Sequence, residues 1–550
     1  MPGGLPSLDN GAPPTEERAR VTPSPDHNVL SVLRRVATRF PERRALVMES
    51  GSVTFGDLWR RVDRTSSGLR RLGLAPGDRA IVMIPMSIDL YVAMLAILEM
   101  GAVAVFVDPW IGRRQIASFA AFARPCAWLG IPKSHVLRLL DPRLRQIPFT
   151  VTTGWRLGSL PGRRTLAELE ATPGDGQVHP VERDDSALIT FTSGSSGEPK
   201  GANRTHRFLL AQHEALAHEF PAREGDVDMP MFPVFALNNL ASGVPSIVPA
   251  MDFRRVDQVD AARVLVQMKT QGVTTCTASP PFFDRLAAEV ARRPGNIPAL
   301  RRILTGGAPV TDAQLRVWRR AFPETEILVV YGSTEAEPVA HLTAEERLAA
   351  KGPGFCAGAP GERVRAKIVR IHSGPIDLGP GGWSECELPA GEIGELVVAG
   401  DHVGRDYYEN PKAVRENKIV DGDGTVWHRM GDTGSFDPEG RFWIAGRVHS
   451  TIRRGGELIH PQLVEQAAQG EDPRVRRAAA VGLPDPELGQ RVAVVIETAE
   501  DGFESEVAAR LAAGGFTADE ILFTAEPLPV DPRHNSKIDY GSLRSRLRSR

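Results

Sequence analysis

The chain has 550 residues, of which 42% are hydrophobic and 24% are charged, and its formal net charge is −2. This composition is typical of a globular protein, and the length suffices for several compact units. The near-neutral charge excludes an electrostatic basis for binding nucleic acid or an anionic membrane surface. Four cysteines without a Cys-x-x-Cys pair argue against disulfides and against a structural zinc site.

The N-terminal part of the chain carries no pattern for secretion or membrane insertion. Residues 1–26 contain prolines, glycines and mixed charges without an apolar block, which predicts a disordered tail and no signal peptide. The most apolar region, residues 80–107, is interrupted by Pro85, Asp89 and Glu99, so we expect no transmembrane segment. These features predict a soluble, cytoplasmic protein.

Strand and helix patterns alternate from residue 27 onward. Gly101 stands where a glycine commonly follows a helix. The alternation of strand and helix patterns predicts a parallel α/β sheet. Helical spacing of apolar residues and short apolar runs predict, respectively, helices at 30–37, 57–72 and 88–100 and strands at 45–48, 53–55, 80–84 and 102–107.

A short strand at residues 187–191 leads into a loop of glycines and hydroxyl residues. Glycines let backbone N–H groups approach a bound anion, the hydroxyls add donors, and Lys200 adds a positive charge suited to phosphate. A P-loop is excluded because Gly201, rather than Ser or Thr, follows Lys200. A flexible surface loop is the alternative. The predicted polyphosphate-binding residues are Thr192, Ser193, Gly194, Ser195, Ser196, Gly197 and Lys200.

Two later strands, at residues 302–305 and 327–330, each lead into a segment with candidate ligand-binding residues. The second segment reads Tyr-Gly-Ser-Thr-Glu. Tyr331 offers an aromatic face for adenine, Thr334 offers a hydroxyl to an α-phosphate, and Glu335 is a hard oxygen ligand for Mg²⁺. A plain β-turn is the alternative for this pentapeptide alone, but its place downstream of the glycine-rich loop favours a nucleotide site.

These segments resemble, in order, the motifs of the adenylate-forming superfamily, which comprises acyl-CoA synthetases, luciferases and peptide-synthetase adenylation domains. The resemblance covers residues 27–550 and seven motifs. It implies that Asp432 accepts hydrogen bonds from the ribose, that Arg447 binds ribose or phosphate, and that Lys537 is the catalytic lysine. The residues implied to flank adenine are Gly306, Gly307, Ala308 and Pro309, followed by Tyr331 and Gly332.

The resemblance implies an α/β fold with two domains. A large N-terminal domain, residues 27–447, would contain α/β subdomains and a small β subdomain. A mobile α+β C-terminal domain, residues 448–550, would carry the catalytic lysine, with His449 at the hinge. The alternate arginines from Arg544 to Arg550 do not line one helical face, which predicts a solvated, frayed tail.

The resemblance implies that ATP and Mg²⁺ activate a carboxylic acid as acyl-AMP, with release of pyrophosphate. Four strings further resemble the β-lactone synthetases, which implies a 3-hydroxy fatty acid as substrate and closure of a β-lactone. These strings begin at Phe232, Pro245, His428 and Pro529. The candidate residues of the acyl pocket are Phe232, Phe235, Ala236 and Gly306.

Other functions stay open at the level of sequence. One alternative is a long-chain acyl-CoA ligase or a fatty acyl-AMP ligase, which would load coenzyme A or an acyl carrier protein. Another is a non-catalytic nucleotide-binding protein, although every residue expected to bind and activate ATP is present. The base for lactone closure is not assigned, and His449 and His534 are both candidates.

Overall fold

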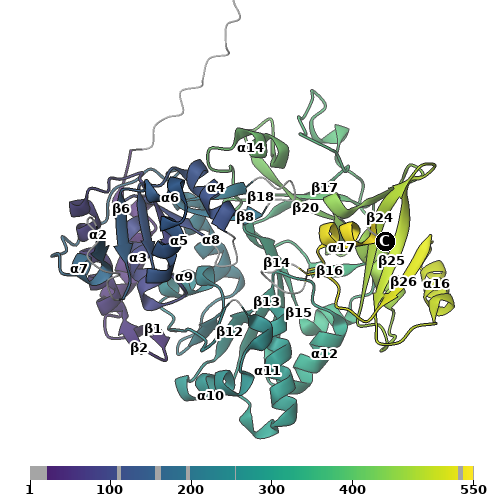
Figure 1. Cartoon of the computed structure of the whole chain (residues 1–550), viewed down its shortest axis with the longest axis horizontal. Helices are drawn as coiled ribbons and strands as arrows, with labels where there is room; N and C mark the ends of the chain where they lie inside the picture. Colours follow the sequence, from purple (N-terminus) through teal and green to yellow (C-terminus); the bar gives the residue numbers. More distant parts are fainter. Residues whose placement is uncertain are drawn as a thin grey trace, which may run out of the picture.

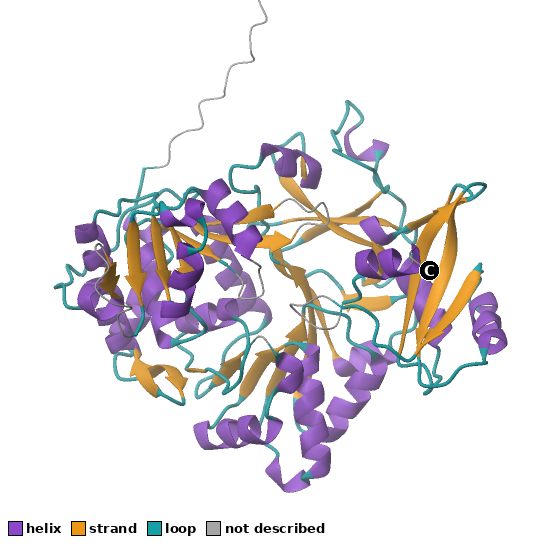
Figure 2. Cartoon of the chain, viewed as in Figure 1, coloured by secondary structure: helices purple, strands orange, loops and turns teal. Residues whose placement is uncertain are grey.

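The computed structural model of the chain describes residues 22–107, 113–154, 163–193, 199–253, 255–530 and 537–548. Within these residues, three large sheets are followed by a smaller C-terminal unit, at the right of Figure 1. Figure 2 shows that the helices pack around the sheets. This architecture confirms the predicted α/β fold class. The division into domains at residues 447 and 448 stays a prediction.

The first sheet has the strand order β7-β6-β5-β3-β4-β8-β9 and is parallel except at its last pair. Strand β9 runs antiparallel to β8, so the chain reverses at the predicted phosphate loop. The strands are β3 (Arg79–Met83), β4 (Val103–Phe106), β5 (Ala127–Gly130), β6 (Phe149–Thr152), β7 (Arg163–Thr165), β8 (Ser186–Ser193) and β9 (Pro199–Thr205).

The second sheet has the order β15-β14-β13-β12-β10-β11-β1-β2. Its interior strands are parallel, and the two edge strands, β2 and β15, pair in the antiparallel direction. The strands are β1 (Arg44–Met48), β2 (Gly51–Thr54), β10 (Asp228–Pro230), β11 (Ser246–Ile247), β12 (Thr275–Ala278), β13 (Arg302–Gly306), β14 (Glu326–Ser333) and β15 (Ala336–Thr343).

Helix α3 (Ile88–Glu99) contacts strands of both of these sheets. It is apolar on nearly every side, which is typical of a helix without a solvent-facing surface. Its boundaries follow the predicted pattern, since the Ser87 side chain caps the first turn and Gly101 follows with φ +73°. None of the described helices is long and apolar enough to cross a membrane.

The other helices of the large sheets cover their faces, and α11 and α12 lie at the bottom of Figure 1. Helix α2 begins at a Thr54 cap and ends at Gly73, as the sequence pattern predicted within two residues. The helices are α1 (Leu30–Arg39), α2 (Phe55–Leu72), α4 (Arg113–Ala123), α5 (Pro132–Leu139), α6 (Pro142–Arg145), α7 (Leu166–Glu170), α8 (His206–Glu219), α9 (Pro233–Ser242), α10 (Ala261–Gln271), α11 (Pro280–Arg292), α12 (Asp312–Ala321) and α13 (Ala344–Ala349).

The third sheet has the order β16-β21-β20-β18-β17, and β19 pairs with β20. Its strands are β16 (Phe355–Gly358), β17 (Arg365–Val369), β18 (Gly394–Ala399), β19 (Lys418–Val420), β20 (Val426–Phe436) and β21 (Phe442–Arg447). Helix α14 (Pro411–Asn417) leads directly into β19. The C-terminal unit contains β22 (Ile452–Arg454), β23 (Glu457–Ile459), β24 (Arg477–Asp485), β25 (Gly489–Glu497), β26 (Glu520–Thr524), α15 (Pro461–Gln469), α16 (Glu504–Ala513) and α17 (Tyr540–Arg548).

The described residues near both termini are more ordered than the sequence predicted. Residues 1–21 lie outside the described residues, but Ser24 already exchanges backbone hydrogen bonds with Val181, so the predicted tail of residues 1–26 is too long. The predicted frayed C-terminus is instead helix α17 up to Arg548. The alternate arginines did not reveal this helix, because it is held by the buried side chain of Leu543 packing on β24 and β25.

Glu99, at the end of α3, is fully buried, and its burial together with the nearby Asp63 carboxylate raises its pKa to about 8. Because the folded-state pKa exceeds the ordinary value of 4.5, the stabilising contribution is complete below about pH 4.5 and is lost as the pH rises through about 8. We expect Glu99→Gln to raise the melting temperature at pH 9 by at least about 2 °C, and by much less at pH 5.5. Thermal unfolding at both pH values tests this, and an equal change at both would contradict it.

Candidate nucleotide-binding site

The predicted phosphate loop lies where β8 turns back into β9. The antiparallel register pairs Phe191 with Gly201, which places Lys200 next to this turn. The Lys200 Nζ atom donates a hydrogen bond of 3.4 Å to Asn417 Oδ1. The residues Gly194, Ser195, Ser196 and Gly197 and the side chains of Thr192 and Ser193 lie outside the described residues, so their predicted roles stay predictions.

Strand β14 carries the predicted adenine-facing residues. It extends to Ser333, so Tyr331 and Gly332 belong to the strand and not to a loop after it, because the register pairs Tyr331 with Ala340 of β15. A Cβ atom on Gly332 would lie 2.7 Å from the Ala336 carbonyl oxygen. The backbone approach of β15 therefore requires a glycine at this position.

The glycine loop after β13 lies next to β14. Gly306 pairs with Val330, and a Cβ atom on Gly306 would lie 2.3 Å from the Val330 carbonyl oxygen. Close strand packing thus explains this glycine, and its role in an acyl pocket stays a prediction. Gly307 follows with φ +77°, in the left-handed region that favours glycine, and Ala308 and Pro309 complete the bend.

Asp432 is a buried carboxylate that two of the predicted nucleotide-binding residues contact. The Tyr331 hydroxyl donates to Asp432 Oδ2 over 2.7 Å, and Arg447 Nε lies 2.9 Å from Asp432 Oδ1. The pairing of β20 with β21 places Asp432 opposite Arg447. Burial and the Asp432 charge raise the pKa of Tyr331, which therefore stays a neutral donor, and the Asp432 charge also raises the pKa of Arg447.

Glu335 lies in the turn between β14 and β15 and is held by a second group of side chains. The Tyr407 hydroxyl donates to Glu335 Oε1 over 3.0 Å, and the Gly404 N–H donates to the Glu335 carbonyl oxygen over 2.7 Å. Burial acts to raise the pKa of Glu335, but His428, Lys418 and the Tyr407 hydrogen bond outweigh it and lower the pKa. Glu335 is consequently an ionised carboxylate, as a magnesium ligand must be.

The backbone next to Glu335 is fixed from β9. Arg204 is buried, donates from Nη2 to the Thr334 carbonyl oxygen over 3.0 Å, and lies over the Phe208 ring at 5.6 Å. Since a guanidinium presents several donors in a rigid plane, this contact orients the turn that carries Thr334 and Glu335.

Lys537 lies in the segment that joins β26 to α17, and residues 531–536, which include His534, lie outside the described residues. A backbone hydrogen bond holds the segment after Lys537, since the Asp539 N–H donates to the Pro529 carbonyl oxygen over 2.8 Å. The Tyr540 hydroxyl donates to Glu465 of α15 over 2.8 Å, and Tyr540 lies close enough to Arg447 to raise its pKa. The end of this segment is therefore held on α15 of the C-terminal unit, and the catalytic role of Lys537 stays a prediction.

Helix α15 docks the C-terminal unit onto the third sheet. His460 Nδ1 lies 3.1 Å from Thr433 Oγ1, and the Gly354 N–H donates to Gln466 Oε1 over 2.8 Å. His449 lies in a short 3-10 turn, residues Val448–Ser450, between β21 and β22. Burial and the adjacent Arg447 lower the pKa of His449, and its predicted hinge role is not tested by this geometry.

Comparison with known proteins identifies the family of this chain. A family model described as AMP-binding enzyme matches residues 33–408 of the chain. The chain belongs to the AMP-binding enzyme family. It is also similar to a protein named olefin beta-lactone synthetase from Stenotrophomonas maltophilia, with 34% identity over 92% of this chain and 93% of that protein. The long-chain-fatty-acid–CoA ligase FadD13 from Mycobacterium tuberculosis is 27% identical, over 92% of this chain and 96% of that protein.

Solved structures share the fold of this AMP-binding enzyme. The amide bond synthetase McbA from Marinactinospora thermotolerans has a TM-score of 0.78 and 23% identity, covering 94% of this chain and 99% of that chain. The ATP-bound MatB from Rhodopseudomonas palustris has a TM-score of 0.76 and 20% identity, covering 95% and 99% respectively.

Three of the four predicted acyl-pocket residues lie at the start of α9. Phe232 precedes the first turn, its ring centroid lies 6.3 Å from that of Phe235, and both rings are half-buried. Ala236 is fully buried in the hydrophobic core beneath α9. A place in an acyl pocket therefore stays a prediction for the two aromatic residues, whereas core packing alone accounts for the alanine.

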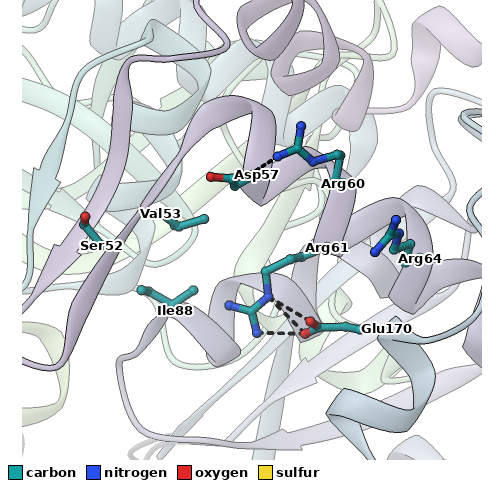
Figure 3. A pocket seen from close by; sticks show the side chains of 8 residues that line it. All are labelled: Ser52, Val53, Asp57, Arg60, Arg61, Arg64, Ile88 and Glu170. Atoms are coloured by element: carbon teal, nitrogen blue, oxygen red, sulfur yellow. Dashed lines mark hydrogen bonds and ion pairs between the residues drawn. The ribbon is translucent and has the colours of Figure 1, made fainter.

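A pocket of about 420 Å³ lies elsewhere in this AMP-binding enzyme, on helix α2 (Figure 3). Arg61 points into it and pairs with Glu170 and Asp89 over 2.7 and 2.8 Å, while Arg60 pairs with Asp57. These carboxylates pair with Arg60 and Arg61, and Arg64 lines the pocket as well. None of the predicted nucleotide-site residues that the structure describes lines it.

Sequence reasoning missed Tyr407, Lys418 and His428 as neighbours of Glu335. Lys418 begins the three-residue strand β19 and lies opposite His428 across the β19–β20 pair. The sequence offered one signal for Lys418, a lysine beside two apolar residues. Which side of so short a strand faces the protein interior cannot be assigned from sequence.

Proposed function

We propose that this AMP-binding enzyme uses ATP and Mg²⁺ to activate a fatty or 3-hydroxy fatty acid as acyl-AMP and then closes the acyl-AMP to a β-lactone. The observation that carries the proposal is the arrangement around β14, where Asp432 is positioned by Tyr331 and Arg447, and Glu335 lies ionised in the turn that ends the same strand. The similarity to two proteins named olefin beta-lactone synthetase, each at 34% identity, supports the lactone as product.

The chain's own residues would divide the nucleotide between them. Tyr331 would lie against adenine, and Asp432 and Arg447 would bind the ribose, while Lys200 and the glycine-rich loop would bind the outer phosphates. Mg²⁺, when bound, supplies charge neutralisation on the phosphate oxygens. Within the described residues no cluster of three or more His, Cys, Asp or Glu is arranged to hold a metal ion. A single ionised carboxylate such as Glu335 fits a cation that is shared with substrate phosphates.

The first step joins two anions, so positioning and charge neutralisation lower its barrier. A carboxylate oxygen of the acid bonds to the α-phosphorus as the bond from this phosphorus to the bridging oxygen breaks, and pyrophosphate leaves with the electron pair. The Lys537 ammonium would bridge the carboxylate and the α-phosphate, and the Thr334 hydroxyl would donate to the α-phosphate.

The second step needs no further substrate, because the attacking hydroxyl is already part of the acid. The 3-hydroxyl oxygen bonds to the acyl carbon, the bond from this carbon to the phosphate oxygen breaks, and AMP leaves. The hydroxyl proton passes to a base, which the chain's described residues do not identify. Orientation of the bound acyl chain replaces a second binding event in this step.

Product analysis by mass spectrometry tests the proposal. With ATP, Mg²⁺ and a 2-alkyl-3-hydroxy fatty acid, we expect AMP, pyrophosphate and a β-lactone that is lighter than the acid by one water, whether or not coenzyme A is present. The matched acid without the 3-hydroxyl should give pyrophosphate but no lactone. Formation of a thioester that requires coenzyme A, without any lactone, would contradict the second step and favour an acyl-CoA ligase.

The acyl-CoA ligase is kept as a second candidate because several relatives at 27 to 28% identity are named as CoA ligases or synthases. ATP binding without pyrophosphate release would instead favour a non-catalytic nucleotide-binding protein. A cytoplasmic location and the use of an acyl carrier protein stay predictions.

A further inference from the structure

Two consecutive residues lie beside Lys200 and Glu335, which are predicted to bind the outer phosphates of ATP and Mg²⁺. Asn417 contacts Lys200, and Lys418 contacts the residues that hold Glu335. Asn417 is the last residue of α14, and Lys418 is the first residue of β19. Strand β19 places Lys418 directly opposite His428 of β20, so both side chains lie on the same face of the third sheet. Nothing in the predicted motifs includes this dipeptide.

Asn417 contacts Lys200, which lies just after the glycine-rich loop. Its Oδ1 atom accepts the hydrogen bond from Lys200 Nζ at 3.4 Å. The amide orientation is fixed by its other atoms, because Nδ2 donates to the Ala413 carbonyl oxygen over 2.7 Å. The backbone is fixed as well, since His428 Nδ1 lies 3.3 Å from the Asn417 carbonyl oxygen. The asparagine thus presents a rigid acceptor to Lys200.

Lys418 reaches toward Glu335. Its side chain is buried, and its ammonium donates to the Gly404 carbonyl oxygen and lies 5.1 Å from the centroid of the Tyr407 ring. Gly404 and Tyr407 are the same two residues that donate hydrogen bonds to Glu335. Every one of these contacts therefore joins Lys418 to a group that positions the Glu335 carboxylate.

A buried ammonium is costly unless opposite charge compensates it. Glu335 and Asp406 offset part of that cost here, but burial outweighs them and lowers the pKa of Lys418 to about 8. An apolar residue at this position would avoid the cost if the position served only packing. The burial of a cation beside the carboxylate that is predicted to bind Mg²⁺ indicates a role toward the ligand.

We propose that Asn417 and Lys418 are positioning residues that hold Lys200 and Glu335 in place to receive the magnesium-bound outer phosphates of ATP. This inference rests on the proposed function, because it takes ATP as the ligand. Neither residue needs to touch the reacting atoms. The pair instead couples the cation of the phosphate loop to the carboxylate of the metal site through one rigid helix-to-strand junction.

Isothermal titration calorimetry of the full-length chain with MgATP, ATP plus EDTA, and AMP tests the role of Lys418. We expect Lys418→Met to weaken MgATP binding about tenfold or more and AMP binding by less than about twofold, because AMP lacks the outer phosphates. Lys412→Met, which changes an exposed lysine on the adjacent helix α14, should leave all three affinities unchanged. A parallel loss of AMP and MgATP affinity would show a merely structural role and overturn the inference.

Asn417→Ala provides a second variant in case the lysine variant folds poorly. Since Asn417 contacts Lys200 and not Glu335, we expect weaker ATP binding both with Mg²⁺ and with EDTA, and normal AMP binding. Unchanged ATP affinity in this variant and in Lys418→Met would also overturn the inference. If the unaltered chain binds no MgATP, the proposed function itself fails, which separates the two conclusions.

Discussion

Lys537→Ala is expected to reduce ATP–pyrophosphate exchange by about a thousandfold or more, while the affinity for ATP changes little. A lysine that bridges the carboxylate and the α-phosphate stabilises charge that develops only as the new bond forms. Its removal should therefore affect the rate of adenylation and not nucleotide binding. Isotope exchange between pyrophosphate and ATP measures the rate, and calorimetry measures the affinity.

An exposed lysine elsewhere in the chain provides a control for this test. Tyr540, three residues after Lys537, donates a hydrogen bond to Glu465 of α15, so the end of the Lys537 segment is held on the C-terminal unit. Lys351→Ala, which changes an exposed lysine between α13 and β16, is the matched control and should show a normal rate of ATP–pyrophosphate exchange. Near-normal exchange in Lys537→Ala would remove this lysine from the mechanism.

Asp432→Asn is expected to weaken the binding of both ATP and AMP by about a hundredfold. The substitution keeps the shape of the side chain but removes the charge that accepts from Tyr331 and Arg447, and an amide group would face one of these two donors. Hydrogen bonds to charged groups are each worth about 1.5–3 kcal/mol, and two would be weakened together with those to the ribose. Calorimetry with AMP isolates this effect, because AMP has no outer phosphates.

The prediction for Asp432→Asn has its own control variant, and the result that would contradict it differs from the one for Lys418→Met. Asp423→Asn, at an exposed turn before β20, should bind both nucleotides normally. A loss confined to MgATP would show that Asp432 acts on the phosphate side instead of the ribose side. Unchanged AMP affinity in Asp432→Asn would therefore remove the predicted ribose contact.

The sequence by itself determined the local elements of this protein. Helix α3 with the Gly101 that follows it and the strand that enters the phosphate loop both follow the predicted patterns. These features depend on the periodicity of side chains and on the backbone preferences of nearby residues, which a short stretch of sequence contains. The order of motifs likewise indicated the family and the predicted ligand-binding positions.

Only the tertiary structure decided which of these residues meet. The register of β20 and β21 sets Asp432 against Arg447, and the position of β14 brings the Tyr331 hydroxyl to the same carboxylate. Lys418 came to Glu335 in the same way, through the pairing of a three-residue strand. The helix at the C-terminus depended on burial of Leu543. Each of these contacts joins distant parts of the chain, so strand register and packing decide it, and no local pattern contains that information.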